Sequence, residues 1–246
     1  TGWREQRKRA WMWVMATPLV TIFLIHSSRG AVAANKLLQE FAGYLVTDRW
    51  CVYNRWSVFL RQLCWAHLKR DFTKMSERAG DSAALGALLL EEHKKMFARW
   101  HRVRDGTLAR STFQRDMRPI RARVEQLLAA GTRSSNKATA GMCREILKLA
   151  PALWTFVFVE GVAPTNNFGE RQIRRAVMWR KTSFGTHSAA GSRFVERIMT
   201  TSATLRQQGR NVVEFVMSAM DAQARGLPPP SLLPTEPSVE QLATAA

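Results

Sequence analysis

The sequence predicts an α/β protein in which a mixed sheet with flanking helices is interrupted by an all-helical insertion. Two near-continuous apolar runs, 10–16 and 19–26, are rich in Trp, Val, Ile and Phe, which is typical of strands covered on both faces. Apolar residues at three- and four-residue steps further along the chain indicate amphipathic helices. Asp48 and Glu170 are separated by far more residues than a compact loop contains, which favours an inserted helical segment between them.

The first part of the core is predicted at 1–79. The two apolar runs form a hairpin with Pro18 between them. A short strand is expected to deliver Asp48 at its C-terminal end, where open α/β sheets place their chemistry. The remaining predicted elements of this part are a helix at 30–40, strands at 44–47 and 58–63, and a basic helix at 65–78.

The helical insertion is predicted at 80–150. Its first helix carries an apolar stripe made of Leu85, Leu88, Leu89, Met96 and Trp100. A second helix is expected at 112–130 with a kink at Pro119, followed by a loop at 131–135 and a helix at 137–150.

The second part of the core is predicted at 151–226 and contains the helix that bears Glu170. Phe194, Ile198 and Leu205 mark the apolar face of the next helix. Asn211 is expected to cap a last helix that ends at Gly226. The segment 227–246 is rich in proline and poor in aromatics, so it is predicted to be disordered.

Charge indicates a nucleic-acid partner. Lys and Arg number 37 against 19 Asp and Glu, which gives a formal net charge of +18 and a pI near 11.2. Ribosomal or merely solvated basic chains are the alternative, but they are often poor in core residues, whereas this chain is 46% hydrophobic. A packed protein of one large or two small domains that binds DNA is therefore expected.

Glu170 is the most informative single residue, because it stands at a helix start within a dense run of cations. A carboxylate in such surroundings is either neutralised by them or shares a polyanionic ligand with them through a divalent ion. The alternative is a capping box in which Asn167 and Glu170 satisfy backbone N–H groups. The cations are Arg171, Arg174, Arg175, Arg180 and Lys181.

Cysteine usage favours a reducing, cytoplasmic setting, because Cys51, Cys64 and Cys143 are odd in number and irregularly spaced. Cys64 and His67 have metal-ligand spacing, but zinc needs about four ligands, so a structural role is preferred. The longest apolar stretch, 10–25, is interrupted by Pro18 and too short to span a bilayer, so no membrane partner is expected.

The C-terminal part of the chain contains four motifs in one order, PTNNFGER (164–171), WRKTSFG (179–185), GSRFVER (191–197) and LRQQGR (205–210). Together they resemble the insertion sequence 66 family of bacterial DDE transposases. The middle of the chain is similar to the same family at VTDRW (46–50) and RQLCWAHLKRDF (61–72). The resemblance covers nearly the whole chain and is weakest from about 80 to 139.

The resemblance implies a ribonuclease-H-like core that cleaves DNA and transfers strands. Two Mg²⁺ or Mn²⁺ ions would be held by acids that include Asp48 and Glu170, with His67, Asn166 and Asn167 as neighbours. The five cations beside Glu170 would bind phosphates of transposon ends. The implied partners are transposon-end and target DNA and other copies of the chain on DNA, without a small-molecule substrate, in the bacterial cytoplasm at the nucleoid.

The first acid of the family lies in the sequence Asp-Glu-Thr-Gly-Trp, and this chain opens at Thr1. We therefore expect an in-frame Asp-Glu immediately upstream, whereas a stop codon there would indicate a decayed element. Without that acid the fragment is expected to be inactive. A non-enzymatic DNA-binding remnant is the competing interpretation, and a ribonuclease-H-type or resolvase nuclease, which shares the acids but not their context, is a third.

Overall fold

The computed structural model describes residues 1–233, so most of the predicted disordered tail, from 234 onward, lies outside the described residues. The chain divides into two compact units, and each is described by itself. Unit 1 is formed by Thr1–Phe41 together with the chain from Asn167 onward, and unit 2 by Ala42–Asn166. No helix among the described residues combines the length and the apolar character that crossing a bilayer requires.

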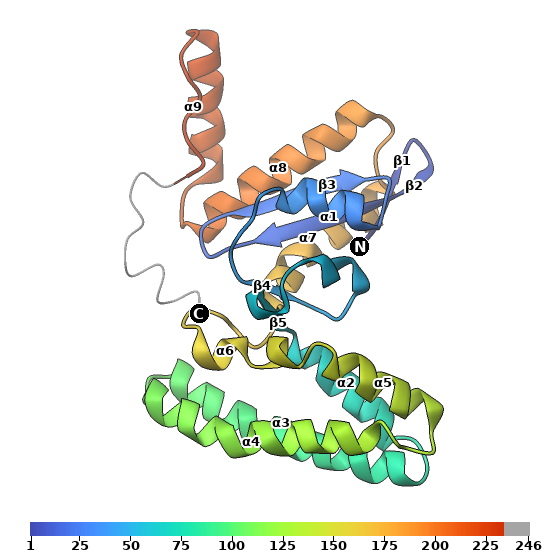
Figure 1. Ribbon diagram of the computed structural model, residues 1–246. Coiled ribbons are helices and arrows are strands. Elements are labelled where there is room, and N and C mark those ends of the chain that lie inside the picture. The colour runs from blue at the N-terminus through green and yellow to red at the C-terminus, as the bar shows by residue number, and fades with distance from the viewer. Residues whose placement is uncertain (234–246) are drawn as a thin grey trace. The chain divides into compact units, whose positions relative to one another are not determined.

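Unit 1 packs helices against an antiparallel sheet with the order β1-β2-β3 (Figure 1). A two-residue turn at Gln6 and Arg7, both with positive φ, joins β1 to β2. Its apolar core lies between the sheet and helices α7 and α8, around Trp3, Phe23 and Met199. The elements are β1 (Gly2–Glu5), β2 (Lys8–Ala16), β3 (Thr21–His26), α1 (Ala31–Leu38), α7 (Asn167–Ser183), α8 (Ala189–Gln207) and α9 (Val212–Ala224).

Helix α8 runs along the outer edge of β3. Side chains of the helix, rather than another strand, accept hydrogen bonds from the backbone N–H groups of this edge. The N–H groups of alternate strand residues are accepted by side chains four residues apart on the helix, because two strand residues and one helical turn advance by similar lengths. The N–H of Thr21 is accepted by Thr204 Oγ1 at 3.1 Å, and that hydroxyl donates to Thr21 O at 3.1 Å. The other pairs are Phe23 N–H to Thr200 Oγ1 at 3.0 Å and Ile25 N–H to Glu196 Oε1 at 2.6 Å.

The hydrogen bonds to this edge fix which face of α8 is buried. That face differs from the apolar face predicted from Phe194, Ile198 and Leu205. Leu205 is fully buried as expected, but Phe194 is 61% exposed, while Val195 and Met199 are in the core. Apolar spacing alone could not reveal this rotation, because the polar side chains that bind β3 also face inward.

We expect Thr204→Val to lower the free energy of unfolding of unit 1 by about 1–3 kcal/mol, because the change keeps the shape but leaves two buried backbone groups of Thr21 without their partner. Ser202→Ala is the matched control, since its hydroxyl donates only to Met199 O in its own helix. Urea denaturation of both variants measures the difference. Equal stability of the two would contradict this account of the edge.

Unit 2 combines a two-stranded parallel sheet with a group of long helices, among which α3 and α4 lie side by side (Figure 1). Gly86 on α3 allows the close approach of α2, because a Cβ there would collide with the backbone of Ser76. The elements are β4 (Leu45–Thr47), η1 (Cys51–Arg55), η2 (Val58–Leu60), β5 (Arg61–Leu63), α2 (Trp65–Ser76), α3 (Asp81–Arg104), α4 (Arg110–Gly131), α5 (Lys137–Leu147), η3 (Ala150–Leu153) and α6 (Thr155–Phe158).

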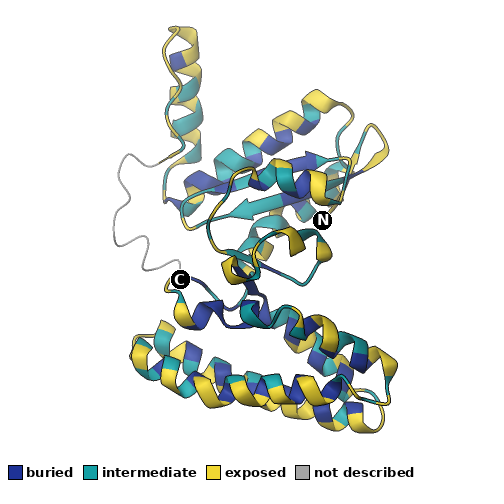
Figure 2. Cartoon of the chain, viewed as in Figure 1, coloured by how far each residue is buried: buried dark blue, intermediate teal, exposed yellow. Residues whose placement is uncertain are grey.

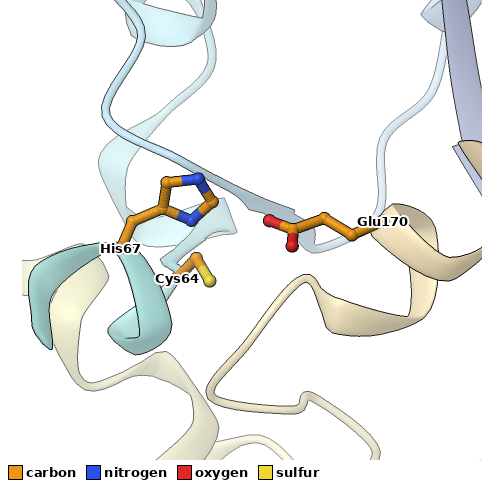
Figure 3. Close-up of side chains that lie close together, drawn as sticks. All are labelled: Cys64, His67 and Glu170. Carbon is orange, nitrogen blue, oxygen red and sulfur yellow. The ribbon is translucent and has the colours of Figure 1, made fainter. Parts of the chain in front are cut away.

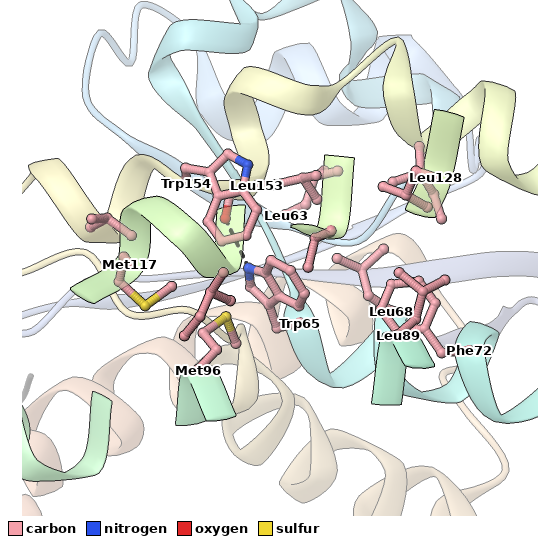
Figure 4. Packing of buried hydrophobic residues seen from close by; sticks show 14 of the residues in the cluster. Leu63, Trp65, Leu68, Phe72, Leu89, Met96, Met117, Leu128, Leu153 and Trp154 are labelled. Atoms are coloured by element: carbon pink, nitrogen blue, oxygen red, sulfur yellow. Dashed lines mark hydrogen bonds between the residues drawn. The ribbon is translucent and has the colours of Figure 1, made fainter. Parts of the chain in front are cut away.

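The core of unit 2 is centred on Trp65, which is fully buried against Trp154, with ring centroids 5.2 Å apart (Figure 4). Burial along α3 follows the predicted apolar stripe, and dark and yellow segments also alternate along the other helices of this unit in Figure 2. Leu88 is the exception within the first stripe, being 36% exposed.

Two predictions about the sheet need correction. The predicted strand at 58–63 is a strand only at Arg61–Leu63, because a 3₁₀ turn precedes it. The expected mixed sheet is present as two separate sheets among the described residues. At the outer edge of β1, the backbone of Thr186 takes the place of a further strand, because Thr186 N–H donates to Arg4 O at 2.9 Å and Gln6 N–H donates to Thr186 O at 2.8 Å.

Candidate functional site

Asp48 lies directly after β4, as predicted, and its side chain is fixed by a turn. Its Oδ1 accepts the N–H of Trp50 at 2.9 Å, which is the arrangement of an Asx turn. The carboxyl group is half-buried. The following residue is also held, because Arg49 forms an ion pair with Asp71 at 2.5 Å. The acid is therefore presented by a rigid strand end rather than by a loose loop.

A buried arginine that the sequence analysis did not single out supports this strand end. Arg61 on β5 is fully buried, and its guanidinium donates to Asn54 Oδ1 at 3.1 Å and, more weakly, to the backbone oxygen of Asp48 at 3.5 Å. Burial lowers the pKa of the Arg61 guanidinium from its ordinary value, while the Asp48 carboxylate and Tyr53 act in the opposite direction. Its place inside the predicted strand at 58–63 is a local signal of burial, but it does not reveal the partners of the guanidinium.

Cys64 connects the ends of both strands to the segment before α7. Its N–H donates to Thr47 O at 2.7 Å, which extends the β4–β5 ladder to the residue before Asp48. Its Sγ accepts the N–H of Asn166 at 3.4 Å, and the N–H of Trp65 donates to Pro164 O at 2.9 Å. These bonds hold the chain at 164–166 against the start of α2, on the same edge as Asp48.

His67 lies on the first turn of α2, and one of its ring nitrogens is within 4.8 Å of Cys64 Sγ. Cys64 is 1% exposed and already accepts a hydrogen bond. Within unit 2 the two side chains make a pair, so metal binding and a structural role of Cys64 both stay predictions.

Glu170 is exposed on the first turn of α7 in unit 1, where Figure 3 draws its side chain. Helix α7 begins at Asn167. Asn166 therefore occupies the position before the helix, and three residues later stands Gly169 rather than Glu170. The capping box of Asn167 and Glu170 stays an alternative to metal binding, because it depends on the single residue at which the helix begins.

The predicted phosphate-binding cations fall into two groups on α7. Arg171, Arg174, Arg175 and Lys181 are exposed. Arg174 and Lys181 share a stripe with Glu170, because positions four and eleven residues apart face the same way on a helix. Arg180 differs from them, since its guanidinium donates to Gly2 O at 2.6 Å and thereby ties α7 to β1.

Comparison with known proteins gives one family and one distant relative. Residues 1–193 match the family described as "Transposase IS66 family". The chain is 23% identical over 241 residues to a protein of Sinorhizobium fredii (strain NBRC 101917 / NGR234) named "Uncharacterized protein y4qI". That alignment covers 89% of this chain but 45% of the relative, so the chain spans less than half the length of the curated relative. No solved structure matches the chain.

Proposed function

We propose that this chain, which belongs to the IS66 family of transposases, supplies Asp48 and Glu170 as two acids of a metal-dependent site for DNA cleavage and strand transfer. The strongest support is a pair of hydrogen bonds that holds residues 164–166 at the start of α2: Asn166 N–H donates to Cys64 Sγ, and Trp65 N–H donates to Pro164 O. Cys64 N–H in turn donates to Thr47 O at the end of β4. Glu170 follows Asn166 by four residues. Because four residues span at most about 14 Å, the Cα atoms of Asn166 and Glu170 cannot lie further apart than that.

The residues at these positions suit a divalent cation. Asp48 and Glu170 offer carboxylate oxygens, which are the ligands that Mg²⁺ and Mn²⁺ prefer. The buried Oδ1 of Asn166 has no hydrogen-bond partner among the described residues, so a carbonyl oxygen is also present without a partner of its own. Bound divalent ions would lower the pKa of an attacking water or 3′-hydroxyl and stabilise the leaving oxygen.

The protein's own contribution is orientation. The Asx turn fixes the Asp48 carboxylate, and Arg61 holds the backbone behind it through Asn54 and the Asp48 carbonyl. Orientation of this kind matters because an in-line phosphoryl displacement depends on positioning and on electrostatic stabilisation.

We assign the exposed cations of α7 to the DNA backbone. Arg174 and Lys181, on the stripe of Glu170, would neutralise phosphates next to the acid, and Arg171 and Arg175 would extend the contact around the helix. Arg180 is assigned instead to positioning β1, because it binds Gly2 O. A ribonuclease-H-like core and self-association on DNA stay predictions from the family resemblance.

The chain is expected to bind duplex DNA with little sequence preference and to lose affinity as salt rises. The logarithm of the binding constant should fall linearly with the logarithm of the salt concentration, with a slope of about −0.9 for each phosphate neutralised. Fluorescence anisotropy with labelled duplexes measures this slope.

The charge reversal Arg174→Glu should make the slope shallower by about one or more, whereas Arg123→Glu, an exposed arginine on α4 of unit 2, is the matched control. Affinity that does not change with salt would contradict the proposed DNA contact. An equal effect of both substitutions would mean that net charge alone, and not α7, determines binding.

A further inference from the structure

Phe184 is the most exposed large apolar side chain among the described residues, at 79%. It lies between α7 and α8, and its backbone has φ +59°, a left-handed conformation that is rare and unfavourable for residues other than glycine, asparagine and aspartate. A bulky residue in this conformation, with its ring in water, is maintained at a cost to stability. Such outliers are a reason to look for function.

The loop that carries Phe184 is held in place on both sides. The N–H of Phe184 donates to Arg180 O at 2.8 Å, and Arg180 itself binds Gly2 O. Two residues later, Thr186 pairs with β1, and its hydroxyl lies 2.7 Å from Ser192 Oγ. Gly185 between them passes so close that a Cβ would collide with Arg4 O. The ring of Phe184 is therefore presented by a rigid loop.

The surroundings of this ring are basic and polar. The β1–β2 hairpin, whose β1 edge binds the loop, exposes Arg4, Arg7, Lys8 and Arg9 against the single acid Glu5 (Figure 2). Within the loop itself the exposed residues beside Phe184 are His187 and Ser188. Lys181 and Thr182 at the end of α7 and Ala189 and Ala190 at the start of α8 are exposed as well. A protein-binding surface has an apolar centre of several residues, and none of these neighbours adds a large apolar side chain to Phe184.

We propose that Phe184 is a stacking residue for an unpaired nucleobase in DNA, with the cations of the hairpin and Lys181 on the flanking phosphates. An aromatic ring presented among cations is the combination by which proteins bind unstacked bases, because the ring covers the base and the charges follow the backbone. The proposal rests on the proposed function for its ligand, DNA, but it concerns a surface that contains neither Asp48 nor Glu170.

The test compares three labelled duplexes by fluorescence anisotropy. One is fully paired, one contains an internal run of unpaired thymidines, and one has the same run made abasic. The wild-type chain should bind the thymidine run roughly tenfold more tightly than the abasic run, because the two differ only in the bases.

Phe184→Gly should abolish that preference and leave affinity for the paired and abasic duplexes unchanged. Its thermal midpoint should equal or exceed that of the wild type, since glycine adopts φ +59° without strain. Phe184→Trp should keep the preference. Phe59→Ala is the matched control, because Phe59 is 72% exposed in unit 2, and it too should keep the preference.

Persistence of the preference in Phe184→Gly would overturn the proposal. A lower thermal midpoint with equal weakening on all three duplexes would also overturn it, because the ring would then be structural. The proposal would also be overturned if Phe184→Gly changed the molecular mass measured by light scattering but kept the base preference. The ring would then contact another protein chain rather than a base. Failure of the wild type to show salt-sensitive binding to the paired duplex would instead contradict the proposed function.

Discussion

Replacing Asp48 by Asn, or Glu170 by Gln, is expected to reduce Mg²⁺- or Mn²⁺-dependent cleavage and strand transfer at least about a hundredfold. Loss of a residue that only supports a metal ligand already costs about 10- to 100-fold, and a carboxylate that binds the ion directly should cost no less. The alignment covers 45% of the curated relative, so the measurement uses the full-length protein. Gel assays of donor cleavage and strand joining give the two rates.

Both substitutions should leave the fold intact. In Asp48→Asn the side-chain amide would still offer an oxygen to the N–H of Trp50, so the Asx turn survives. Glu170 is exposed, and Gln has nearly the same shape and helix propensity. Thermal unfolding of each variant within a few degrees of the wild type checks this point.

A matched control is present in α9. There Asn211 caps the helix, its Oδ1 accepts the N–H of Glu214 at 3.3 Å, and its Nδ2 donates to Glu214 Oε1 at 3.0 Å. This is an Asn-x-x-Glu arrangement with a structural role, so Glu214→Gln should leave activity unchanged. Strand transfer by Glu170→Gln at the rate of Glu214→Gln would remove Glu170 from the proposed site.

Local elements could be predicted from the sequence because their signals are local. The β2–β3 hairpin, the α1 helix and the strand before Asp48 follow from apolar runs and their interruptions, and all three are confirmed. The cap at Asn211 is confirmed as well, since a single side chain and its own helix determine it.

The pairing of strands and the rotation of α8 depend on contacts between distant residues. Nothing near Thr204 in sequence indicates that its hydroxyl replaces a strand at the edge of β3. Likewise, the closure of the β1 edge by Thr186 depends on a segment more than 180 residues away in the chain. These long-range polar contacts explain why a mixed sheet was predicted and two sheets are found.

The candidate site shows the same division. The motifs that contain Asp48 and Glu170 were found from residue types and order, and their catalytic roles remain proposals. The roles of Arg61 and Arg180 could not be predicted from the sequence. The residue type alone does not distinguish an arginine that supports the backbone from one that would bind DNA. Only their partners, Asn54 and Gly2, distinguish them.

Trp65→Ala is expected to lower the free energy of unfolding of unit 2 by about 3–5 kcal/mol, through lost burial and the cavity left behind. Trp65 is fully buried, and its Nε1–H donates to Leu153 O at 2.8 Å (Figure 4). Trp65→Phe should cost less, because it keeps most of the apolar surface and leaves the Leu153 carbonyl with Gln62 Nε2–H as its donor, at 3.2 Å. Trp56→Ala, a half-buried tryptophan in the same unit, is the control and should cost clearly less than Trp65→Ala.

Hydrogen exchange is the appropriate measurement, because it reports the two units separately. The N–H groups of Cys64 and Asn166 should lose protection together in Trp65→Ala, since both belong to the bonds that join the strand ends to residues 164–166. Protection at Ile25, whose N–H is held by Glu196 in unit 1, should not change. Loss of protection at Ile25 to the same extent would show that the units unfold as one. Retained protection of the Asn166 N–H with loss of protection at the Cys64 N–H would mean that the segment before Glu170 is held by something other than these bonds. The main support for the proposed catalytic role of Glu170 would then be lost.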